Sequence, residues 1–293
     1  MAVLDGRKLA AARQEEIKAR VDGLRARGVT PTIAPLLIEG NSAGEIYFRN
    51  KKLLADRLRL GFRGVMLPAG TDVTVLIKEI HRLNDDPAVH GIFVELPLPP
   101  GISVDAIGRE IAPEKDIDAL NPANLGRLLS GGARAASYAE LAARSDLFLP
   151  ATPRAVIELL IASGIDPAGK ETVIVGGGTT GLALDMLILR WGYGNVTVCE
   201  HRGKALREIV PRGDIVIACA GVPRLITADM VREGAVVIDV GINATEDGIV
   251  GDVDFDSVRE KAALITPVPG GVGPMTTTMI MENTVNAAER LCK

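Results

Sequence analysis

The chain has 293 residues, enough for two domains, and its 47% hydrophobic and 24% charged residues are typical of a globular protein. The net charge of -4 offers no excess of basic groups to bind a phosphate backbone, and the 3% of aromatic residues offers few rings to stack on bases, so a nucleic-acid partner is not expected. Three scattered cysteines lack disulfide or zinc spacing, which favours a reducing compartment without a metal site. Asp5 precedes any apolar segment of signal length, and no window approaches about eighteen apolar residues. We therefore expect a cytoplasmic protein that binds neither nucleic acid nor membrane.

The first half of the chain alternates helical and strand patterns. In chain order we predict a helix at Leu9–Leu24, a strand at Ile33–Ile38, helices at Ile46–Leu60 and Val73–Leu83, and a strand at Gly91–Leu96. Prolines then end the strand, and the stretch to about Leu149 looks looser, with Asp116, Asp118 and Asn121 in a predicted loop. We place the domain boundary in this looser stretch.

The second half alternates more cleanly, which predicts a parallel, doubly wound sheet with helices on both faces. The predicted helices are Arg154–Ser163, Leu182–Trp191, Lys204–Val210, Thr227–Arg232 and Thr276–Leu291, and the predicted strands are Thr172–Val175, Val196–Cys199, Ile215–Ala220 and Ala235–Val240. The fold class is thus α/β with two domains. We expect a catalytic domain at 1–149, completed by the helix within 274–293, and a Rossmann-like domain at 150–273.

A glycine-rich loop follows the predicted strand that ends at Val175. Its sequence, Gly176-Gly177-Gly178-Thr179-Thr180-Gly181, precedes a helix, as in dinucleotide-binding folds, where glycines let the backbone approach a diphosphate at the helix N-terminus. Glu200 ends the next strand and can bond the ribose 2′-hydroxyl of NAD, whereas Arg202 can pair with the 2′-phosphate of NADP. A turn without a ligand and a solvated Glu200 are the alternatives.

Four residues of the first half suggest a chemical site. Tyr47 and Lys51 stand four positions apart on one predicted helix and share a face, although, taken alone, they are better explained by an amphipathic helix with a half-buried Tyr and a Lys that reaches solvent. Glu95 lies at the carboxyl end of a predicted strand, and Asp118 lies in the loop beyond. Since ligands of open α/β sheets bind beyond the carboxyl ends of strands, both acids belong near a site.

The sequence resembles, over nearly its whole length, the methylenetetrahydrofolate dehydrogenase/cyclohydrolase (FolD) family. The segment TPVPGGVGPMT, Thr266–Thr276, is highly specific for it, and VELPLP, KDID, NPANLGRL, VTVC and VVIDVGIN follow the family's other motifs in order. The resemblance implies a homodimer with a folate cleft between its domains. It also implies oxidation of 5,10-methylenetetrahydrofolate with NAD or NADP, followed by hydrolysis of the methenyl product to 10-formyltetrahydrofolate.

The resemblance also implies roles for single residues. Lys51 is similar to the family's catalytic lysine, and a desolvated lysine can activate the water that hydrolyses an electrophilic carbon. Tyr47 resembles the tyrosine that stacks on the folate, and Asp118 the aspartate that bonds the pterin. The Pro269-Gly270-Gly271 turn resembles the segment that lines the folate site. Ile242 resembles a position that contacts the cofactor, with core packing as the alternative.

The sequence departs from the family pattern near both sites. Where the family usually has Gln it has Glu95, which would stabilise the ammonium of Lys51 and weaken it as a base unless Glu95 is protonated or is the base itself. If Glu95 does weaken Lys51 as a base, replacing Glu95 with Gln should raise methenyl hydrolysis. The cofactor loop lacks the usual arginine, which together with Glu200 favours NAD. Ala151 replaces a frequent cysteine, and Ala119 a glycine.

Three other functions stay open at this point. The first is a dehydrogenase whose cyclohydrolase activity is weakened by Glu95, and the second is a relative that binds folate or dinucleotide without turnover. The third is a different Rossmann dehydrogenase of the shikimate type, which would require the match at Thr266–Thr276 to be accidental.

Overall fold

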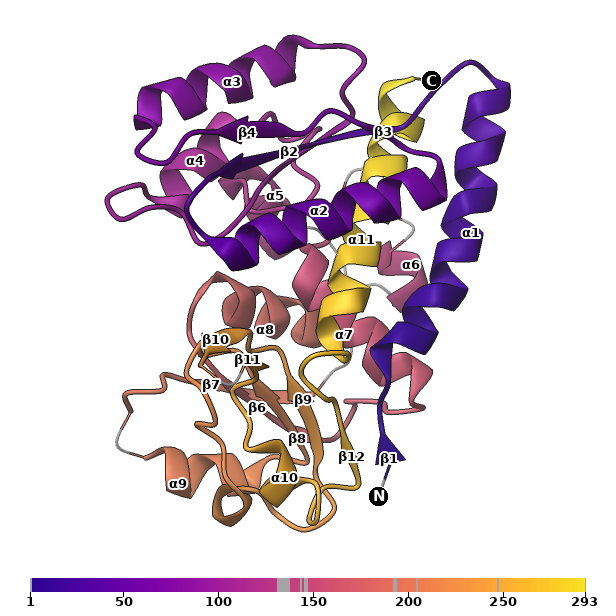
Figure 1. Ribbon diagram of the computed structural model, residues 1–293. Helices are drawn as coiled ribbons and strands as arrows, with labels where there is room; N and C mark the ends of the chain where they lie inside the picture. Colours follow the sequence, from indigo (N-terminus) through magenta and orange to yellow (C-terminus); the bar gives the residue numbers. More distant parts are fainter. Residues whose placement is uncertain are drawn as a thin grey trace. The chain divides into compact units, whose positions relative to one another are not determined.

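Figure 1 shows a computed structural model of the chain, which describes residues 2–130, 138–142, 144, 147–191, 194–203, 205–246 and 248–292. The helices are α1 Gly6–Ala26, α2 Ser42–Leu58, α3 Val73–Asp85, α4 Val104–Glu110, α5 Pro122–Ser130, α6 Tyr138–Ala142, α7 Ala151–Ala162, α8 Thr179–Trp191, α9 Leu206–Ile209, α10 Phe255–Val258 and α11 Val272–Leu291, with 3-10 turns at Val210–Arg212 and Ala228–Met230. The strands are β1 Ala2–Val3, β2 Thr32–Ile38, β3 Gly61–Phe62, β4 Val65–Leu67, β5 Gly91–Val94, β6 Glu171–Val175, β7 Asn195–Cys199, β8 Ile215–Ala218, β9 Val236–Asp239, β10 Asn243–Thr245, β11 Gly248–Val250 and β12 Leu264–Ile265.

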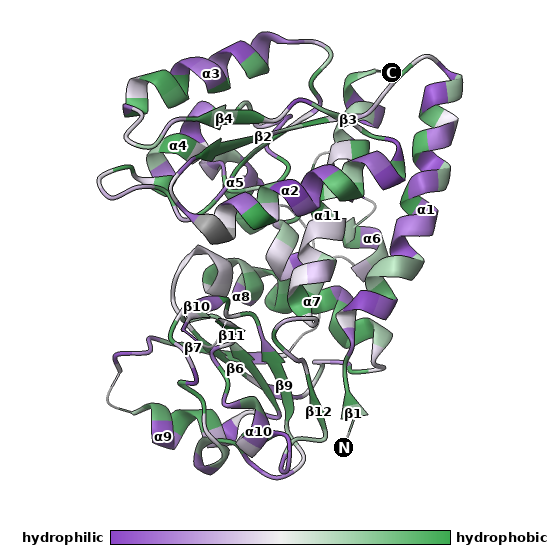
Figure 2. Ribbon diagram, viewed as in Figure 1, coloured by the Kyte–Doolittle hydropathy of each residue, from purple (hydrophilic) through white to green (hydrophobic). Residues whose placement is uncertain are grey.

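The central strands are among the most apolar segments of the chain. Figure 2 shows β2, β6 and β9 in the green of hydrophobic residues. Every residue of β2, β8 and β9 is buried, as expected for parallel strands that are covered on both faces. Within the described ranges, no helix is long and apolar enough to cross a membrane.

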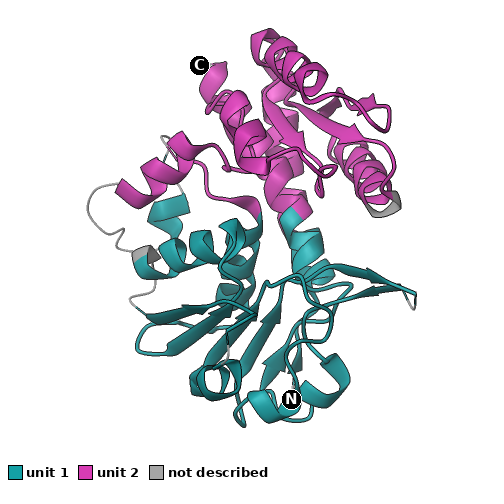
Figure 3. Ribbon diagram, turned by 90° about the vertical axis from the view of Figure 1, so that its left-hand side faces the viewer, with its two compact units in different colours: residues 1–11, 132–144, 152–276 teal, residues 12–131, 145–151, 277–293 magenta. Residues whose placement is uncertain are grey.

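The chain divides into two compact units, coloured separately in Figure 3. Unit 1 comprises residues 1–11, 132–144 and 152–276. Unit 2 comprises residues 12–131, 145–151 and 277–293. Both units contain a parallel sheet with helices, which confirms the predicted α/β class.

The sheet of unit 1 is parallel, with the strand order β1-β12-β9-β8-β6-β7. The chain leaves β6 to form β7 on one side and then returns to form β8 on the other side. The carboxyl end of β6 is therefore a topological switch point, where ligands of doubly wound sheets bind. The predicted glycine loop begins at this point with Gly176, and β10 and β11 form a separate antiparallel hairpin.

In unit 2, β2 pairs in parallel with β3, β4 and β5. Helices α3 and α4 pack against one face of this sheet through Leu76, Ile80 and Ile107. Figure 1 shows α2 on the opposite face. Strand β5 ends at Val94, so Glu95 follows it directly. The backbone N–H of Glu95 donates to the carbonyl of Leu36 in β2 at 2.9 Å, which fixes the position of the residue.

Several predicted boundaries were wrong. The looser stretch after residue 97 contains α4, α5 and α6, which are too short for apolar periodicity to reveal. Helix α7 begins at Ala151 and α11 at Val272, each ahead of its predicted start, because Pro153 and Pro274 fit the first helical turn. The helix predicted from Lys204 covers only Leu206–Ile209, and Lys204 lies outside the described residues. Strand β5 ends before Leu96.

Candidate active site

Lys51 and Glu95 form a buried ion pair in unit 2. Lys51 extends from α2 and donates from Nζ to Glu95 Oε2 at 2.8 Å. Each residue is only 4% exposed. Charges removed from water in this way are stable only as partners, so neither side chain can be deleted without leaving the other charge uncompensated. Glu95 therefore lies close enough to Lys51 for its charge to act on the ammonium.

The second oxygen of Glu95 has a different environment from the first. Oε1 is buried and accepts no hydrogen bond from the described part of the chain. Burial raises the pKa of the Glu95 carboxyl, while the nearby charge and hydrogen bond of Lys51 act in the opposite direction. The pair thus contains one satisfied carboxylate oxygen and one open acceptor.

Two aromatic rings surround the ammonium of Lys51. The Nζ atom lies 4.6 Å from the centroid of the Phe93 ring and 5.8 Å from that of Tyr47. Tyr47 is one turn before Lys51 on α2, so the predicted shared face is confirmed, and partial burial raises the pKa of its hydroxyl. Ring faces attract cations at these distances. Phe93 was not predicted as a site residue. It lies two positions before Glu95, and side chains two positions apart in an extended segment point to the same face.

Asp118 lies in the loop after Lys115–Ile117, which runs beside β5 through a bridge between Ile92 and Asp116. Its carboxylate accepts the N–H of Ala151. Burial, and next the charge of Asp116, raise the pKa of Asp118 to about 7, although the charge of Lys51 opposes them. The charges of Lys51 and Glu95 thus both act on the Asp118 carboxyl.

The C-terminal helix fixes the loop that carries Asp118. Asn283 of α11 donates from Nδ2 to the carbonyls of Ile117 at 2.8 Å and of Leu149 at 3.1 Å. Ala119 keeps the left-handed conformation, with φ of 56°, where the family pattern has glycine. Sequence reasoning did not identify Asn283, because it stands among other polar residues of the helix, such as Glu282, Thr284 and Asn286, and nothing in the pattern sets it apart.

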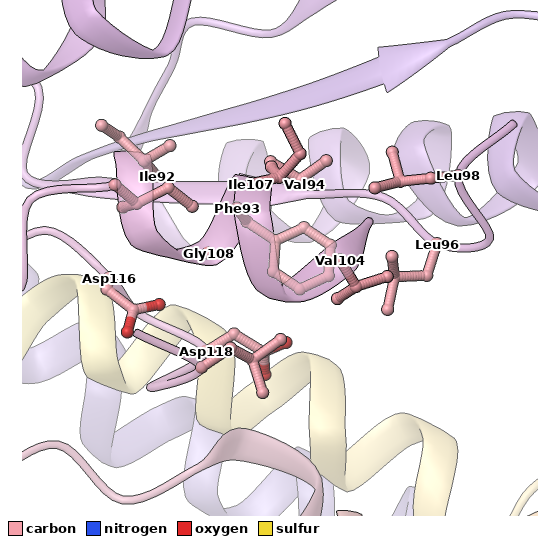
Figure 4. Close-up of a pocket in the computed structure, with 12 residues that line it drawn as sticks. Ile92, Phe93, Val94, Leu96, Leu98, Val104, Ile107, Gly108, Asp116 and Asp118 are labelled. Carbon is pink, nitrogen blue, oxygen red and sulfur yellow. The ribbon is translucent and has the colours of Figure 1, made fainter. Parts of the chain in front are cut away.

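A pocket opens beside this loop. Its walls are apolar side chains of β5, of the segment after it and of α4, and its polar groups are the carboxylates of Asp116 and Asp118. Figure 4 shows Phe93 and Asp118 facing the same space from opposite sides. The pocket is small, and Tyr47, Lys51 and Glu95 are not among the residues that line it.

The cofactor loop of unit 1 is shaped by close backbone approaches. Gly176 has φ of 129°, and a Cβ there would lie 2.4 Å from the carbonyl oxygen of Cys219. A Cβ on Gly181 would lie 1.8 Å from the carbonyl oxygen of Gly176. Gly178 has open space, and α8 begins at Thr179. A bare loop against a helix N-terminus fits the diphosphate of a dinucleotide, so the residues present fit the predicted cofactor.

Glu200 lies against this loop. A Cβ on Gly177 would lie 2.3 Å from Glu200 Oε1, so the carboxylate occupies the space that a longer side chain would fill. The Glu200 side chain is 64% exposed, and its Oε2 lies 3.6 Å from Nδ1 of His201. Arg202 donates from Nε to Nε2 of His201 at 3.3 Å. The three residues form one exposed polar cluster at the carboxyl end of β7.

The remaining predicted residues also lie in unit 1. The Pro269-Gly270-Gly271 turn precedes α11, and Gly270 accepts the N–H of Gly6 at 3.0 Å. Ile242, in the loop after β9, is 48% exposed and is therefore not a core residue. Asp252 accepts the N–H groups of Ala220 and Gly221 at 2.6 and 2.8 Å, a buried support that sequence reasoning missed.

The predicted residues thus form two groups. Tyr47, Lys51, Glu95 and Asp118 belong to unit 2, whereas the cofactor residues and the Pro269-Gly270-Gly271 turn belong to unit 1. In the described ranges, no group of three or more His, Cys, Asp or Glu side chains could hold a metal ion.

Two family models match the chain. The model described as tetrahydrofolate dehydrogenase/cyclohydrolase, catalytic domain, covers residues 4–118, and the corresponding NAD(P)-binding domain covers residues 150–292. The chain belongs to the tetrahydrofolate dehydrogenase/cyclohydrolase family. Membership confirms the resemblance and removes the shikimate-type alternative, and it assigns NAD or NADP as the cofactor class.

Individual relatives agree with this family over full length. The bifunctional protein FolD of Halalkalibacterium halodurans is 43% identical over 290 residues, which are 98% of each chain. The structure of the bifunctional FolD enzyme of Campylobacter jejuni has a TM-score of 0.89, with 38% identity over 99% of each chain. That of the Trypanosoma brucei FolD, complexed with NADP and an inhibitor, has a TM-score of 0.90, with 36% identity over 100% of this chain and 99% of that one.

Proposed function

We propose that the chain oxidises 5,10-methylenetetrahydrofolate to the 5,10-methenyl form with NAD or NADP and hydrolyses that product to 10-formyltetrahydrofolate. The observation that carries this proposal is the buried Lys51–Glu95 pair, coupled to Asp118 beside an apolar pocket. A positioned acid–base group of this kind can accelerate the hydrolysis of an electrophilic carbon. The full-length relatives are named bifunctional, so a chain with a weakened cyclohydrolase and a binder without turnover are the less favoured alternatives.

The folate, in this proposal, binds to a catalytic domain of residues 1–149 completed by the helix within 274–293. Tyr47 stacks on the substrate because its half-buried ring projects from the same face of α2 as Lys51. Asp118 binds the pterin, and a carboxyl whose pKa is about 7 can exchange a hydrogen bond in either protonation state near neutrality. The Pro269-Gly270-Gly271 turn lines the substrate.

The cofactor, in this proposal, binds to a domain of residues 150–273. Gly176, Gly177, Gly178, Thr179 and Gly181 hold the diphosphate at the N-terminus of α8, Glu200 and Arg202 face the adenosine ribose, and Ile242 contacts the nicotinamide. When bound, the dinucleotide supplies a ring that accepts the hydride. The protein's part in that reaction is to orient the substrate carbon and exclude water.

We also propose that the protein is a homodimer and is located in the cytoplasm. The family resemblance supports a homodimer, and the composition supports a cytoplasmic location. Multi-angle light scattering of the purified protein would give the mass directly. A mass of one chain at assay concentrations would rule the dimer out.

The catalytic proposal is tested by two absorbance assays on the purified protein. In the first, 5,10-methylenetetrahydrofolate is oxidised with NAD and with NADP in parallel, and in the second, the decay of added methenyltetrahydrofolate is compared with the rate in buffer. We expect enzyme-dependent turnover in both assays. Oxidation without accelerated decay would limit the chain to a dehydrogenase, and tight folate binding with no turnover would make it a binder.

A further inference from the structure

We propose that Asp252 is a positioning residue for the dinucleotide: its buried carboxylate holds the backbone turn after β8 in the place where the glycine loop packs against it. The inference rests on the proposed use of NAD or NADP and adds a residue to that site. Asp252 lies between β11 and α10 and belongs to unit 1, as do all the residues that it contacts below. Its part is to place backbone for the cofactor, not to take part in the chemistry.

The carboxylate of Asp252 joins three hydrogen-bond donors in the interior of unit 1. Asp252 is 0% exposed. Its Oδ2 accepts the N–H groups of Ala220 and Gly221 at 2.6 and 2.8 Å, and its Oδ1 accepts Nδ2 of Asn243 at 2.8 Å. A buried carboxylate that loses a donor is strongly destabilised. Any displacement of the turn that carries Ala220 and Gly221 is therefore opposed.

Asp252 is itself held by the end of β9. Asp239 is the last residue of that strand and is 3% exposed. Its Oδ1 accepts the N–H of Asp252 at 2.9 Å and the N–H of Gly241 at 3.0 Å. A Cβ on Gly241 would lie 2.2 Å from Asp252 Oδ1, so the backbone after β9 packs directly on the carboxylate. The two aspartates thus tie the turns after β8 and β9 to the same edge of the sheet.

The turn that Asp252 holds contacts the glycine loop. Strand β8 lies between β6 and β9 in the sheet (Figure 1). The turn begins at Cys219, whose N–H donates to the carbonyl of Val175 at 2.8 Å. The carbonyl oxygen of Cys219 would lie 2.4 Å from a Cβ on Gly176, so the turn forms one wall of the loop at the switch point. A shift of this wall would move the backbone that approaches the diphosphate.

An amide at position 252 would loosen this arrangement without changing its shape. The oxygen of the amide could still accept the N–H groups of the turn, but these bonds would be weaker than bonds to a carboxylate. The NH2 group of the amide would face the NH2 group of Asn243, and two donors cannot bond each other. Asp252→Asn is therefore expected to make the turn more mobile rather than to remove it.

The test compares Asp252→Asn with a matched control, Asp256→Asn. The control makes the same chemical change four positions along the chain, but the Asp256 side chain is 91% exposed and lies 3.7 Å from Arg259. The Kd values of NAD and NADP are measured by calorimetry without folate. The Kd of the preferred dinucleotide should rise by about fivefold in Asp252→Asn, because neutral hydrogen bonds replace charge-assisted ones, and stay at the wild-type value in Asp256→Asn.

Methenyl hydrolysis separates positioning from general destabilisation, since it requires no dinucleotide. In Asp252→Asn the KM for the dinucleotide should rise by about the same factor as the Kd, while the rate of hydrolysis stays at the wild-type value. A residue that only supports the fold would instead lower oxidation and hydrolysis by equal factors and leave the Kd unchanged. That result would overturn the inference.

Asn243→Ala provides a second variant, which decides the question if Asp252→Asn does not fold. It removes the donor to Asp252 Oδ1 and leaves the carboxylate in place. The Kd of the dinucleotide should rise by about threefold with unchanged hydrolysis. A Kd equal to that of the wild type would contradict the role of the carboxylate and its donors.

The wild-type protein shows which of the two proposals fails. If it binds NAD or NADP but does not oxidise 5,10-methylenetetrahydrofolate, the proposed oxidation is refuted, and the Kd values of the variants still decide the role of Asp252. If it oxidises the folate and the Kd of Asp252→Asn is unchanged, only the role of Asp252 is refuted. A wild-type protein that binds neither dinucleotide would refute both.

Discussion

The two candidate sites are built in different ways. In unit 2 the chemistry depends on side chains removed from water, since Lys51 and Glu95 are each 4% exposed. In unit 1 the site is a backbone surface, made by Gly176, Gly177 and Gly181, with an exposed Glu200 beside it. Buried charges interact strongly and exposed charges weakly, so substitution should affect the two sites through different mechanisms.

This difference matches the work proposed for each unit. Acid–base chemistry needs groups whose proton affinity differs from that in water, which burial provides. A diphosphate instead needs close N–H donors, which a side chain at the wrong position would block. Substitutions in unit 1 should therefore act by displacing the loop backbone or by removing the charge of Glu200, and substitutions in unit 2 by changing a buried backbone constraint.

Gly181→Ala should have the largest effect on the cofactor site. The added Cβ would lie 1.8 Å from the carbonyl oxygen of Gly176, so the loop must move. Such overpacking costs about 1–3 kcal/mol, which corresponds to a rise of about fivefold to 150-fold in the KM for the dinucleotide. Gly178→Ala, where a Cβ meets no atom within 4 Å, should raise this KM less. Methenyl hydrolysis requires no dinucleotide and provides the internal reference. Equal KM values for the two variants would contradict the role of the close approach.

Glu200→Gln removes the negative charge beside the glycine loop and should have a smaller effect than Gly181→Ala. The wild type should prefer NAD, because a carboxylate at this position bonds the ribose hydroxyl and repels a 2′-phosphate. Since Glu200 is 64% exposed, removing its charge should shift the ratio of kcat/KM for NAD and NADP by about fivefold towards NADP. The control is Glu208→Gln, at an exposed residue of α9. A wild-type preference for NADP of about tenfold would show that Arg202 dominates instead.

Short-range features of both sites could be predicted from the sequence. Helical periodicity places Tyr47 and Lys51 on one face, and the glycine loop is recognisable between a strand and a helix. The position of Glu95 followed from the end of an apolar run, because a strand buried on both faces is readable from its composition.

Long-range features could not be predicted. The contact of Glu200 with Gly177 depends on the register between β6 and β7, and the support of Ile117 by Asn283 joins residues 166 positions apart. The surroundings of Glu95 Oε1, which accepts no hydrogen bond from the described residues, depend on segments distant in sequence, which no local pattern specifies. The sequence also left the conformation of Ala119 open, since an alanine could either keep or change a loop built for glycine.

Ala119→Gly should have the smallest effect, because two contributions oppose each other. The left-handed φ of 56° costs alanine about 1 kcal/mol relative to glycine. The Ala119 methyl, however, is buried against Phe148 and Ala287, and its loss costs about 0.8 kcal/mol. The free energy of unfolding in urea should therefore change by less than about 0.5 kcal/mol. Arg224→Gly is the control, since Arg224 has φ of 52° on an exposed residue, and it should be the more favourable substitution. If Ala119→Gly stabilises the protein more than Arg224→Gly does, the buried methyl contributes nothing, and the loop carrying Asp118 is held by its hydrogen bonds alone.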